Sequence, residues 1–140
     1  MISNREEKIT VMFEVLWNLD LYSEAVKFYA DTGRPFWLTE AVARYYESEG
    51  KFEQSIEEWS YLIDIYFVMG ETAQLMLNYQ DEVFMLGSWY ASTDRDRSIK
   101  YLSAYVGFAY QWRRMPGLKL PYKGRAARML YKLRRPRSCE

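Results

Sequence analysis

The sequence of 140 residues contains no histidine and a single cysteine, Cys139. Without histidine, the chain lacks the commonest general base and the commonest metal ligand of proteins. One cysteine cannot form an internal disulfide, so the sequence fits a reducing compartment. Cys139 also has no histidine to activate it as a nucleophile. These absences predict a protein that is not an enzyme, with no catalytic residues, no metal site and no cofactor.

Long apolar runs are absent too. The longest apolar-looking stretch, residues 101–112, contains Ser103 and Gln111, and it is shorter than the roughly 20 residues that a membrane-spanning helix needs. The first residues are polar and lack the apolar segment of a signal peptide. No glycine-rich phosphate-binding motif or serine nucleophile elbow occurs in the sequence. We therefore expect a cytoplasmic protein without a transmembrane segment.

The formal net charge is zero, but the charges are unevenly distributed. Residues 1–112 carry 9 basic and 18 acidic side chains, a net charge of −9. Residues 113–140 carry 10 basic side chains and 1 acidic side chain, a net charge of +9. An asymmetry of this kind separates an acidic body from a basic tail that has its own binding properties.

Apolar residues at helical spacing predict seven helices, and no alternating run bounded by hairpin turns predicts a strand. Asp20 ends the first helix and is expected to cap the second, while Gly33, Gly50 and Gly70 end the next three. Asp94 and the two residues before it supply a cap for the sixth. The predicted ranges are about 5–18, 22–33, 35–50, 52–70, 71–90, 95–113 and 122–134. The exposed face of the fourth helix is expected to carry Glu53, Glu57, Glu58 and Asp64.

One pattern recurs three times along the chain. A turn residue is followed by a small residue, then a β-branched apolar residue, then a large apolar residue three positions later. The copies are Ala25-Val26 with Tyr29, Ser55-Ile56 with Trp59, and Ser98-Ile99 with Leu102. The small residue allows two helices to approach closely, and the large one fills the gap to the next unit. Such repeats predict a helical array in which no unit buries its apolar face alone.

The pattern resembles the tetratricopeptide-repeat (TPR) superfamily. The match is best in residues 36–67 and weaker in residues 9–32 and 71–105. The resemblance implies an all-α, TPR-like α-solenoid of antiparallel helix-turn-helix units with a C-terminal capping helix. We expect a helical-repeat domain at 1–113, a linker at 114–121 and a basic helix and tail at 122–140. The residues that carry the best match are Val42, Ala43, Tyr46, Gly50, Phe52, Ser55, Ile56, Trp59 and Leu62.

In repeats of this kind, the first helix of each unit lines a concave groove. The resemblance therefore implies a partner-binding groove, acidic with aromatic anchors, that suits a basic or amphipathic peptide or protein segment. The alternative is that its two tryptophans are core residues of neighbouring helices. The predicted groove residues are Glu14, Trp17, Trp37, Glu40, Arg44 and Glu47.

The basic C-terminal segment leaves three interpretations open. It binds nucleic acid such as RNA, it docks on an acidic partner or an anionic membrane surface, or it folds onto the protein's own acidic body as a cap. We predict a non-catalytic protein–protein interaction or scaffolding module, with a nucleic-acid-associated factor as the alternative. The sequence indicates neither the partner nor the oligomeric state. The residues of this basic patch are Lys123, Arg125, Arg128, Lys132, Arg134 and Arg135.

Overall fold

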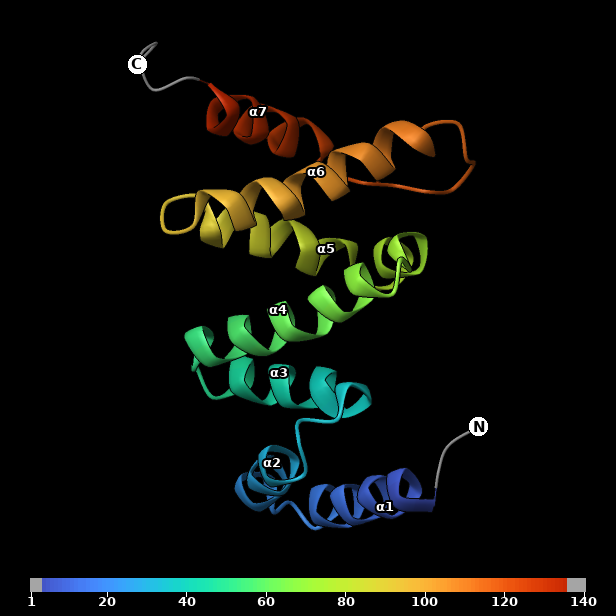
Figure 1. The fold of residues 1–140 in the computed structure, drawn as a ribbon, viewed down its shortest axis with the longest axis vertical. Helices are drawn as coiled ribbons and strands as arrows, with labels where there is room; N and C mark the ends of the chain where they lie inside the picture. The colour runs from blue at the N-terminus through green and yellow to red at the C-terminus, as the bar shows by residue number, and fades with distance from the viewer. Residues whose placement is uncertain (1–3, 136–140) are drawn as a thin grey trace. The chain divides into compact units, whose positions relative to one another are not determined.

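A computed structural model describes residues 4–135, and Cys139 lies outside them. Within that range the chain forms seven α-helices and one short 3-10 helix, with no strands (Figure 1). Helices that follow one another in sequence pack antiparallel in pairs. The predicted all-α class and the predicted number of helices are therefore confirmed. The chain divides into two compact units, residues 1–65 (unit 1) and residues 66–140 (unit 2).

Unit 1 holds the first half of the helices. They are α1 (Asn4–Asn18), α2 (Tyr22–Asp31), the 3-10 helix η1 (Phe36–Leu38), α3 (Thr39–Ser48) and the part of α4 (Phe52–Val68) up to residue 65. The predicted start of the third helix at Pro35 differs slightly from the structure. Pro35 precedes the 3-10 turn, and α3 begins four residues later.

The turns that join α1 to α2 and α3 to α4 have the same backbone geometry. Asp20 and Gly50 both have positive φ, 61° and 73°, and both donate their N–H back into the preceding helix. This is a common helix-ending turn that favours glycine and tolerates aspartate. The expected capping of α2 by Asp20 is wrong: Leu21 is the N-cap, and the Asp20 carboxylate accepts a hydrogen bond from the Tyr22 hydroxyl at 2.8 Å.

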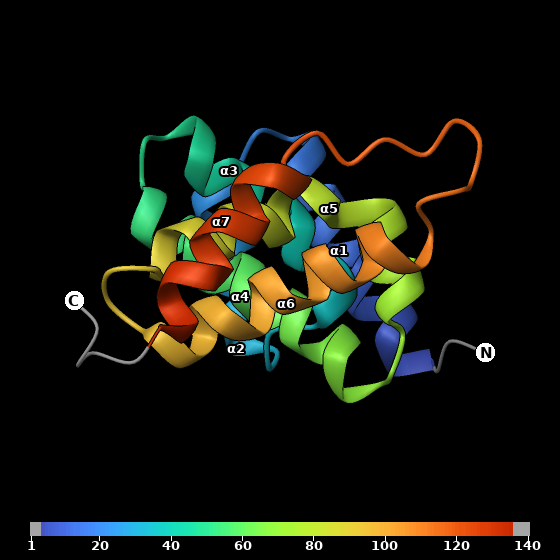
Figure 2. The same ribbon diagram turned by 90° about the horizontal axis from the view of Figure 1, so that it is seen from above.

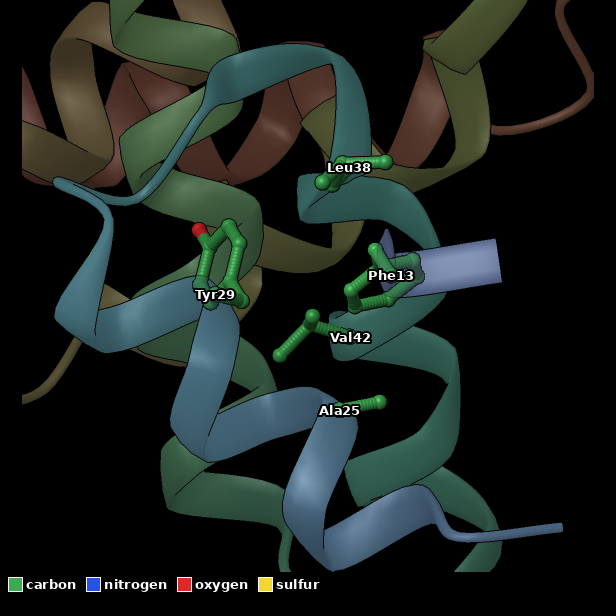
Figure 3. Close-up of a cluster of buried hydrophobic side chains, with 5 residues drawn as sticks. All are labelled: Phe13, Ala25, Tyr29, Leu38 and Val42. Atoms are coloured by element: carbon green, nitrogen blue, oxygen red, sulfur yellow. The ribbon is translucent and has the colours of Figure 1, made fainter. Parts of the chain in front are cut away.

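The core of unit 1 gathers one or two side chains from each of its first four elements. Figure 3 shows Phe13 of α1, Ala25 and Tyr29 of α2, Leu38 of η1 and Val42 of α3 converging on one region. Ala25, the small residue of the first repeat copy, is fully buried. A side chain of this size allows α2 to approach its neighbours closely, which is the role that the repeat predicts.

The pair α3 and α4 buries the second repeat copy. Ser55, Ile56 and Trp59 are all buried, and Trp59 has no exposed surface. Trp59, the large residue of the second repeat copy, is therefore a core residue, as the repeat predicts, whereas Tyr46 of α3 is half-buried. The indole nitrogen of Trp59 donates a 2.7 Å hydrogen bond to the Glu47 carboxylate, so this large side chain is held both by packing and by a hydrogen bond.

Unit 2 contains the last turn of α4, then α5 (Thr72–Tyr90), α6 (Arg95–Gln111) and α7 (Lys123–Arg134). Figures 1 and 2 both show α7 lying against α6, and its buried residues Ala126 and Leu130 explain the contact. Residues 112–122 join α6 to α7 as a long loop. The predicted C-terminal helix at 122–134 is confirmed. The predicted fifth helix is also present, but it kinks at Tyr79, where φ is −135°.

The helices α5 and α6 approach each other closely at Gly87. The hydroxyl of Ser98 donates a 2.6 Å hydrogen bond to the carbonyl oxygen of Gly87. A Cβ atom added at Gly87 would lie 2.5 Å from Cδ2 of Leu102. Ser98 is the small residue of the third repeat copy, and it is fully buried. The expected close contact therefore needs a second small residue, Gly87, on the facing helix.

Two helical glycines of unit 2 should respond to alanine in opposite directions. Gly87→Ala forces Leu102 to move and should destabilise the protein by about 1–3 kcal/mol. Gly107 lies within α6 with no atom within 4 Å of an added Cβ, so Gly107→Ala should stabilise it by about 0.5–1 kcal/mol. Urea denaturation followed by circular dichroism measures both. Equal effects at the two positions would contradict the assigned close approach.

The buried tryptophan of unit 1 provides a second test of the fold. Trp59→Ala should lower the free energy of unfolding by about 3–5 kcal/mol, because it removes a fully buried aromatic side chain. Trp89→Ala is the control, since Trp89 is 43% exposed. It should lower the free energy of unfolding by less than half as much as Trp59→Ala. The comparison uses the same urea titrations, and a larger loss from Trp89→Ala would refute this placement of the core.

Candidate functional site

Unit 1 contains a cleft of about 330 Å³ that we call the unit 1 cleft. One wall is the start of α1, with Arg5, Glu6 and Ile9. The opposite wall is the segment 32–37 that joins α2 to α3, and Tyr61 of α4 closes one side. The cleft is therefore built by three stretches of chain that are distant in sequence, and its shape depends on how the 32–37 segment is held.

The 32–37 segment turns sharply after α2. Gly33 and Arg34 both have positive φ, 86° and 53°, so two successive residues adopt the left-handed conformation. Gly33 ends α2 as the sequence predicts, and the Arg34 N–H donates to the carbonyl oxygen of Tyr29 at 3.0 Å. A left-handed conformation costs a residue with a Cβ about 1–2 kcal/mol. Other contacts of Arg34 must therefore hold it there.

An ion pair with a buried carboxylate holds Arg34. One terminal nitrogen of its guanidinium donates to both carboxylate oxygens of Glu58, at 3.0 and 2.9 Å. Glu58 is buried within α4, which contradicts its predicted place on the exposed face of that helix. The physical reason is the partner: a buried carboxylate is stable only when it is paired and hydrogen-bonded. This contact ties α4 to the turn between α2 and α3.

Two hydroxyl groups extend the ion pair into the core. The Tyr29 hydroxyl donates to Glu58 at 2.9 Å and lies 2.8 Å from the hydroxyl of Thr39. An ionised carboxylate only accepts hydrogen bonds, so Tyr29 donates its single proton to Glu58 and Thr39 donates to Tyr29. The network Thr39–Tyr29–Glu58–Arg34 thus links α3, α2, α4 and the intervening turn through one chain of hydrogen bonds.

The protonation states of this network are stable around neutral pH. Burial raises the pKa of the Tyr29 hydroxyl, and the neighbouring Glu58 charge raises it further. Burial opposes the charge on Arg34, but the hydrogen bond and charge of Glu58 outweigh it, so the pKa of the guanidinium is raised. Tyr29 therefore stays neutral and Arg34 stays charged. The stabilisation from the raised pKa of Tyr29 is complete below pH 10 and is lost as pH rises above that value.

Tyr61 fixes the other side of Arg34. Its ring centre lies 4.0 Å from the guanidinium carbon, within the range of a cation–π contact. Its hydroxyl donates a 2.7 Å hydrogen bond to the carbonyl oxygen of Arg34. Both the side chain and the backbone of Arg34, which lines the cleft, are therefore held by α4.

Two adjacent aromatic residues, Phe36 and Trp37, form the rim. They are 40% and 39% exposed, and their rings meet edge to face with centroids 5.5 Å apart. The indole nitrogen of Trp37 donates to the Thr10 hydroxyl of α1 at 2.8 Å. Its polar edge is thus satisfied, while much of its apolar face stays open to solvent. Of the predicted groove residues, only Trp37 lines this cleft.

The predicted groove residues of α3 lie outside the cleft. Glu40 and Arg44 form an exposed ion pair one turn apart, with 3.1 Å between Nε and the nearer carboxylate oxygen. Glu47 accepts hydrogen bonds from the Trp59 indole at 2.7 Å and from the Ser55 hydroxyl at 3.3 Å. Glu47 therefore supports the packing of α4, and replacing it would disturb the fold as well as any groove.

The two predicted groove residues of α1 differ in environment. Glu14 is exposed. Trp17 is half-buried among aromatic rings, stacked on Phe13 at 5.3 Å and edge-on to Tyr22 at 4.8 Å. Its surroundings match the interpretation of Trp17 as a core residue, which the sequence left open.

The residues of the predicted basic patch lie in four different environments in unit 2. Arg125 lies over the rings of Phe84 and Tyr122, at 5.5 and 5.9 Å from their centroids. Arg134 donates a 2.8 Å hydrogen bond to the Ser103 hydroxyl of α6. A separate cleft is lined by Lys132 and Arg135. The remaining patch residues, Lys123 and Arg128, are exposed on α7.

No family model matches the chain, and neither the curated proteins nor the solved structures include a significant match. Within residues 4–135, no group of three or more metal-ligating side chains could hold an ion. None of the helices described is both long enough and apolar enough to cross a bilayer.

Sequence reasoning missed Glu58, although a signal was present. The residue follows the buried Ser55 by three positions and precedes the buried Leu62 by four, so it lies on the inner side of α4. Because glutamate is charged, Glu58 is predicted from the sequence to lie on the exposed face of the helix instead. Its partner Arg34 is 24 positions away in a turn, and no helical periodicity connects the two.

Removing the Tyr29 hydroxyl tests the buried network. Tyr29→Phe takes a hydrogen bond from a buried carboxylate and should lower the free energy of unfolding by about 1–3 kcal/mol. Tyr22→Phe is the matched control, because its hydroxyl bonds to the exposed Asp20, and it should have a much smaller effect. Urea titrations near neutral pH compare them. Indistinguishable losses would mean that the network contributes no more than a surface hydrogen bond.

Proposed function

We propose that the protein is a non-catalytic, TPR-like protein-interaction module that binds a peptide segment of a partner protein in the unit 1 cleft. The observation that supports this most directly is the rim of two adjacent aromatic side chains, each about two-fifths exposed, in a cleft that Arg34 and Tyr61 also line. Aromatic side chains of this kind are typical anchors of interaction surfaces, because they bury much apolar area at little conformational cost.

The lining of the cleft suits a peptide. Ile9, Phe36, Trp37 and Tyr61 offer apolar surface, while Arg5 and Glu6 add charges of both signs at the opening. A volume of about 330 Å³ accommodates one or two side chains of a bound segment. Because Arg34 is already held by Glu58 and Tyr61, the site needs little ordering when a ligand binds, which favours affinity.

The resemblance to TPR proteins supports the same class of function. Antiparallel helix-turn-helix units are what that resemblance implies, and binding a protein segment is the family's usual role. Of the residues predicted to line a groove, the proposed site retains Trp37. The proposal moves the centre of the site from the α3 residues Glu40 and Glu47 to the turn between α2 and α3.

Site-specific photocrosslinking tests the proposal on the full chain. A photoreactive phenylalanine analogue placed at position 36 should capture a partner segment in cells, and mass spectrometry of the crosslink then identifies that segment. The same analogue at position 89, an exposed tryptophan position in unit 2, is the control. Equal capture at both positions would reject the cleft as the binding site.

The captured segment, made as a labelled peptide, allows a quantitative test. Phe36→Ala combined with Trp37→Ala should weaken binding at least about tenfold, equivalent to about 1.4 kcal/mol, because the anchoring surface is gone. Trp89→Ala should leave the affinity unchanged. Circular dichroism confirms that each variant is folded. Unaltered binding by a folded double variant would refute the proposed function.

A further inference from the structure

Unit 2 contains a second cleft, of about 300 Å³, that we call the basic cleft. The turn between α5 and α6 lines one side with Ser92 and Thr93, and Arg95 follows at the start of α6. The C-terminal end of α7 lines the other side with Lys132 and Arg135. Three basic residues and two hydroxyl-bearing residues thus line one small space. Among its lining residues in the described part of the chain there is no carboxylate.

Arg95 is held in place across this cleft. Its Nε donates a 2.6 Å hydrogen bond to the carbonyl oxygen of Leu133, at the end of α7. That bond fixes the plane of the guanidinium and uses only one of its three nitrogens. The two terminal nitrogens form the planar fork that pairs well with two oxygens of a phosphate group. The ends of α6 and α7 are therefore joined by a side chain suited to binding an oxyanion.

The charge of the whole unit favours the same class of ligand. Residues 66–140 carry 13 basic and 6 acidic side chains, a net charge of +7, whereas residues 1–65 carry 6 and 13, a net charge of −7. The positive charge of unit 2 lies in residues 113–140, because residues 66–112 carry 3 basic and 5 acidic side chains, a net charge of −2. The basic segment 113–140 supplies Lys132 and Arg135 of the basic cleft, and its positive charge raises the local concentration of anions there.

An exposed aromatic residue lies beside the cleft on α7. Arg128, Tyr131 and Arg135 follow one another at spacings of three and four, which places them on one face of the helix and its C-cap. Tyr131 is 70% exposed. Since Arg135 also lines the basic cleft, the face and the cleft are continuous. This arrangement suits single-stranded nucleic acid, because the cations can contact its phosphates while the aromatic ring between them stacks on a base.

We propose that unit 2 binds single-stranded nucleic acid, with a backbone phosphate in the basic cleft between Arg95 and Lys132 and a base stacked on Tyr131. A peptide that carries a single phosphate group would occupy the basic cleft but would make no use of Arg128 and Tyr131 on α7, so nucleic acid fits the site better. An anionic membrane would require more exposed apolar surface than α7 carries. This site is separate from the unit 1 cleft, so either proposal can fail without the other.

Salt-dependent titrations of the full chain test this site. A labelled single-stranded RNA of about 12 nucleotides is titrated at about 50 and 200 mM salt, with fluorescence anisotropy as the readout. The cleft variant is Arg95→Gln with Lys132→Gln. The control, Arg114→Gln with Lys119→Gln, removes the same charge from the exposed loop after α6. Tyr131→Ala is the stacking variant, and circular dichroism shows that each variant is folded.

The expected results differ among the variants. The cleft variant should bind at least about tenfold more weakly at 50 mM salt, and its slope of log affinity against log salt should flatten by about 0.7, because one neutralised phosphate is lost. Tyr131→Ala should weaken binding about tenfold with the slope unchanged, since stacking releases no counterions. The control should stay within about threefold of the unmodified chain, because it removes the same net charge but no direct phosphate contact.

Three outcomes would overturn the proposal. The first is no binding of the unmodified chain at the lower salt concentration. The second is an equal loss in the cleft and control variants, which would indicate only a general charge effect. The third comes from a parallel titration with vesicles containing anionic lipid: if the cleft variant loses vesicle binding but keeps RNA binding, the cleft serves a membrane surface.

Discussion

The ion pair between Arg34 and Glu58 is the interaction on which the architecture of unit 1 depends. It joins the middle of α4 to the turn between α2 and α3, and through Tyr29 and Thr39 it reaches α2 and α3 as well. The Glu58 carboxylate is buried, but the Arg34 side chain is 40% exposed, and partly exposed ion pairs contribute little net stability, so stability alone does not explain this pair. Here it holds Arg34 in a left-handed conformation that the backbone disfavours, and it thereby sets the path of the turn.

The path of that turn determines which side chains face solvent. Consecutive residues of a 3-10 helix point about 120° apart, so three residues cannot all face the core. Leu38 is buried, and Phe36 and Trp37 are consequently directed outward. The exposed aromatic rim is therefore a geometric result of the way in which Arg34 and Pro35 introduce η1. It is not an accident of surface composition, and this is why we place the binding site there.

The sequence predicts the helices well and the polar contacts poorly. Apolar periodicity and the glycine signals locate all seven helices, and the small residues of the repeat, Ala25, Ser55 and Ser98, are buried as expected. These features depend on neighbours within one helix or one turn. The pairing of Glu58 with Arg34 depends on residues in different elements, so local pattern places Glu58 on the wrong side of α4. The basic residues of α7 show the same limit, because Arg125 and Arg134 find partners on α5 and α6 that no local spacing predicts.

Amide hydrogen exchange measured by mass spectrometry on Glu58→Gln tests the central role of the ion pair most directly. The account predicts that segment 32–39 exchanges at least about tenfold faster than in the unmodified protein, because local opening becomes easier when its anchor is lost. Helix α6 of unit 2 should exchange at its original rate in the same sample. Unchanged exchange in segment 32–39, or an equal increase in α6, would contradict the claim that Arg34 and Glu58 hold this turn.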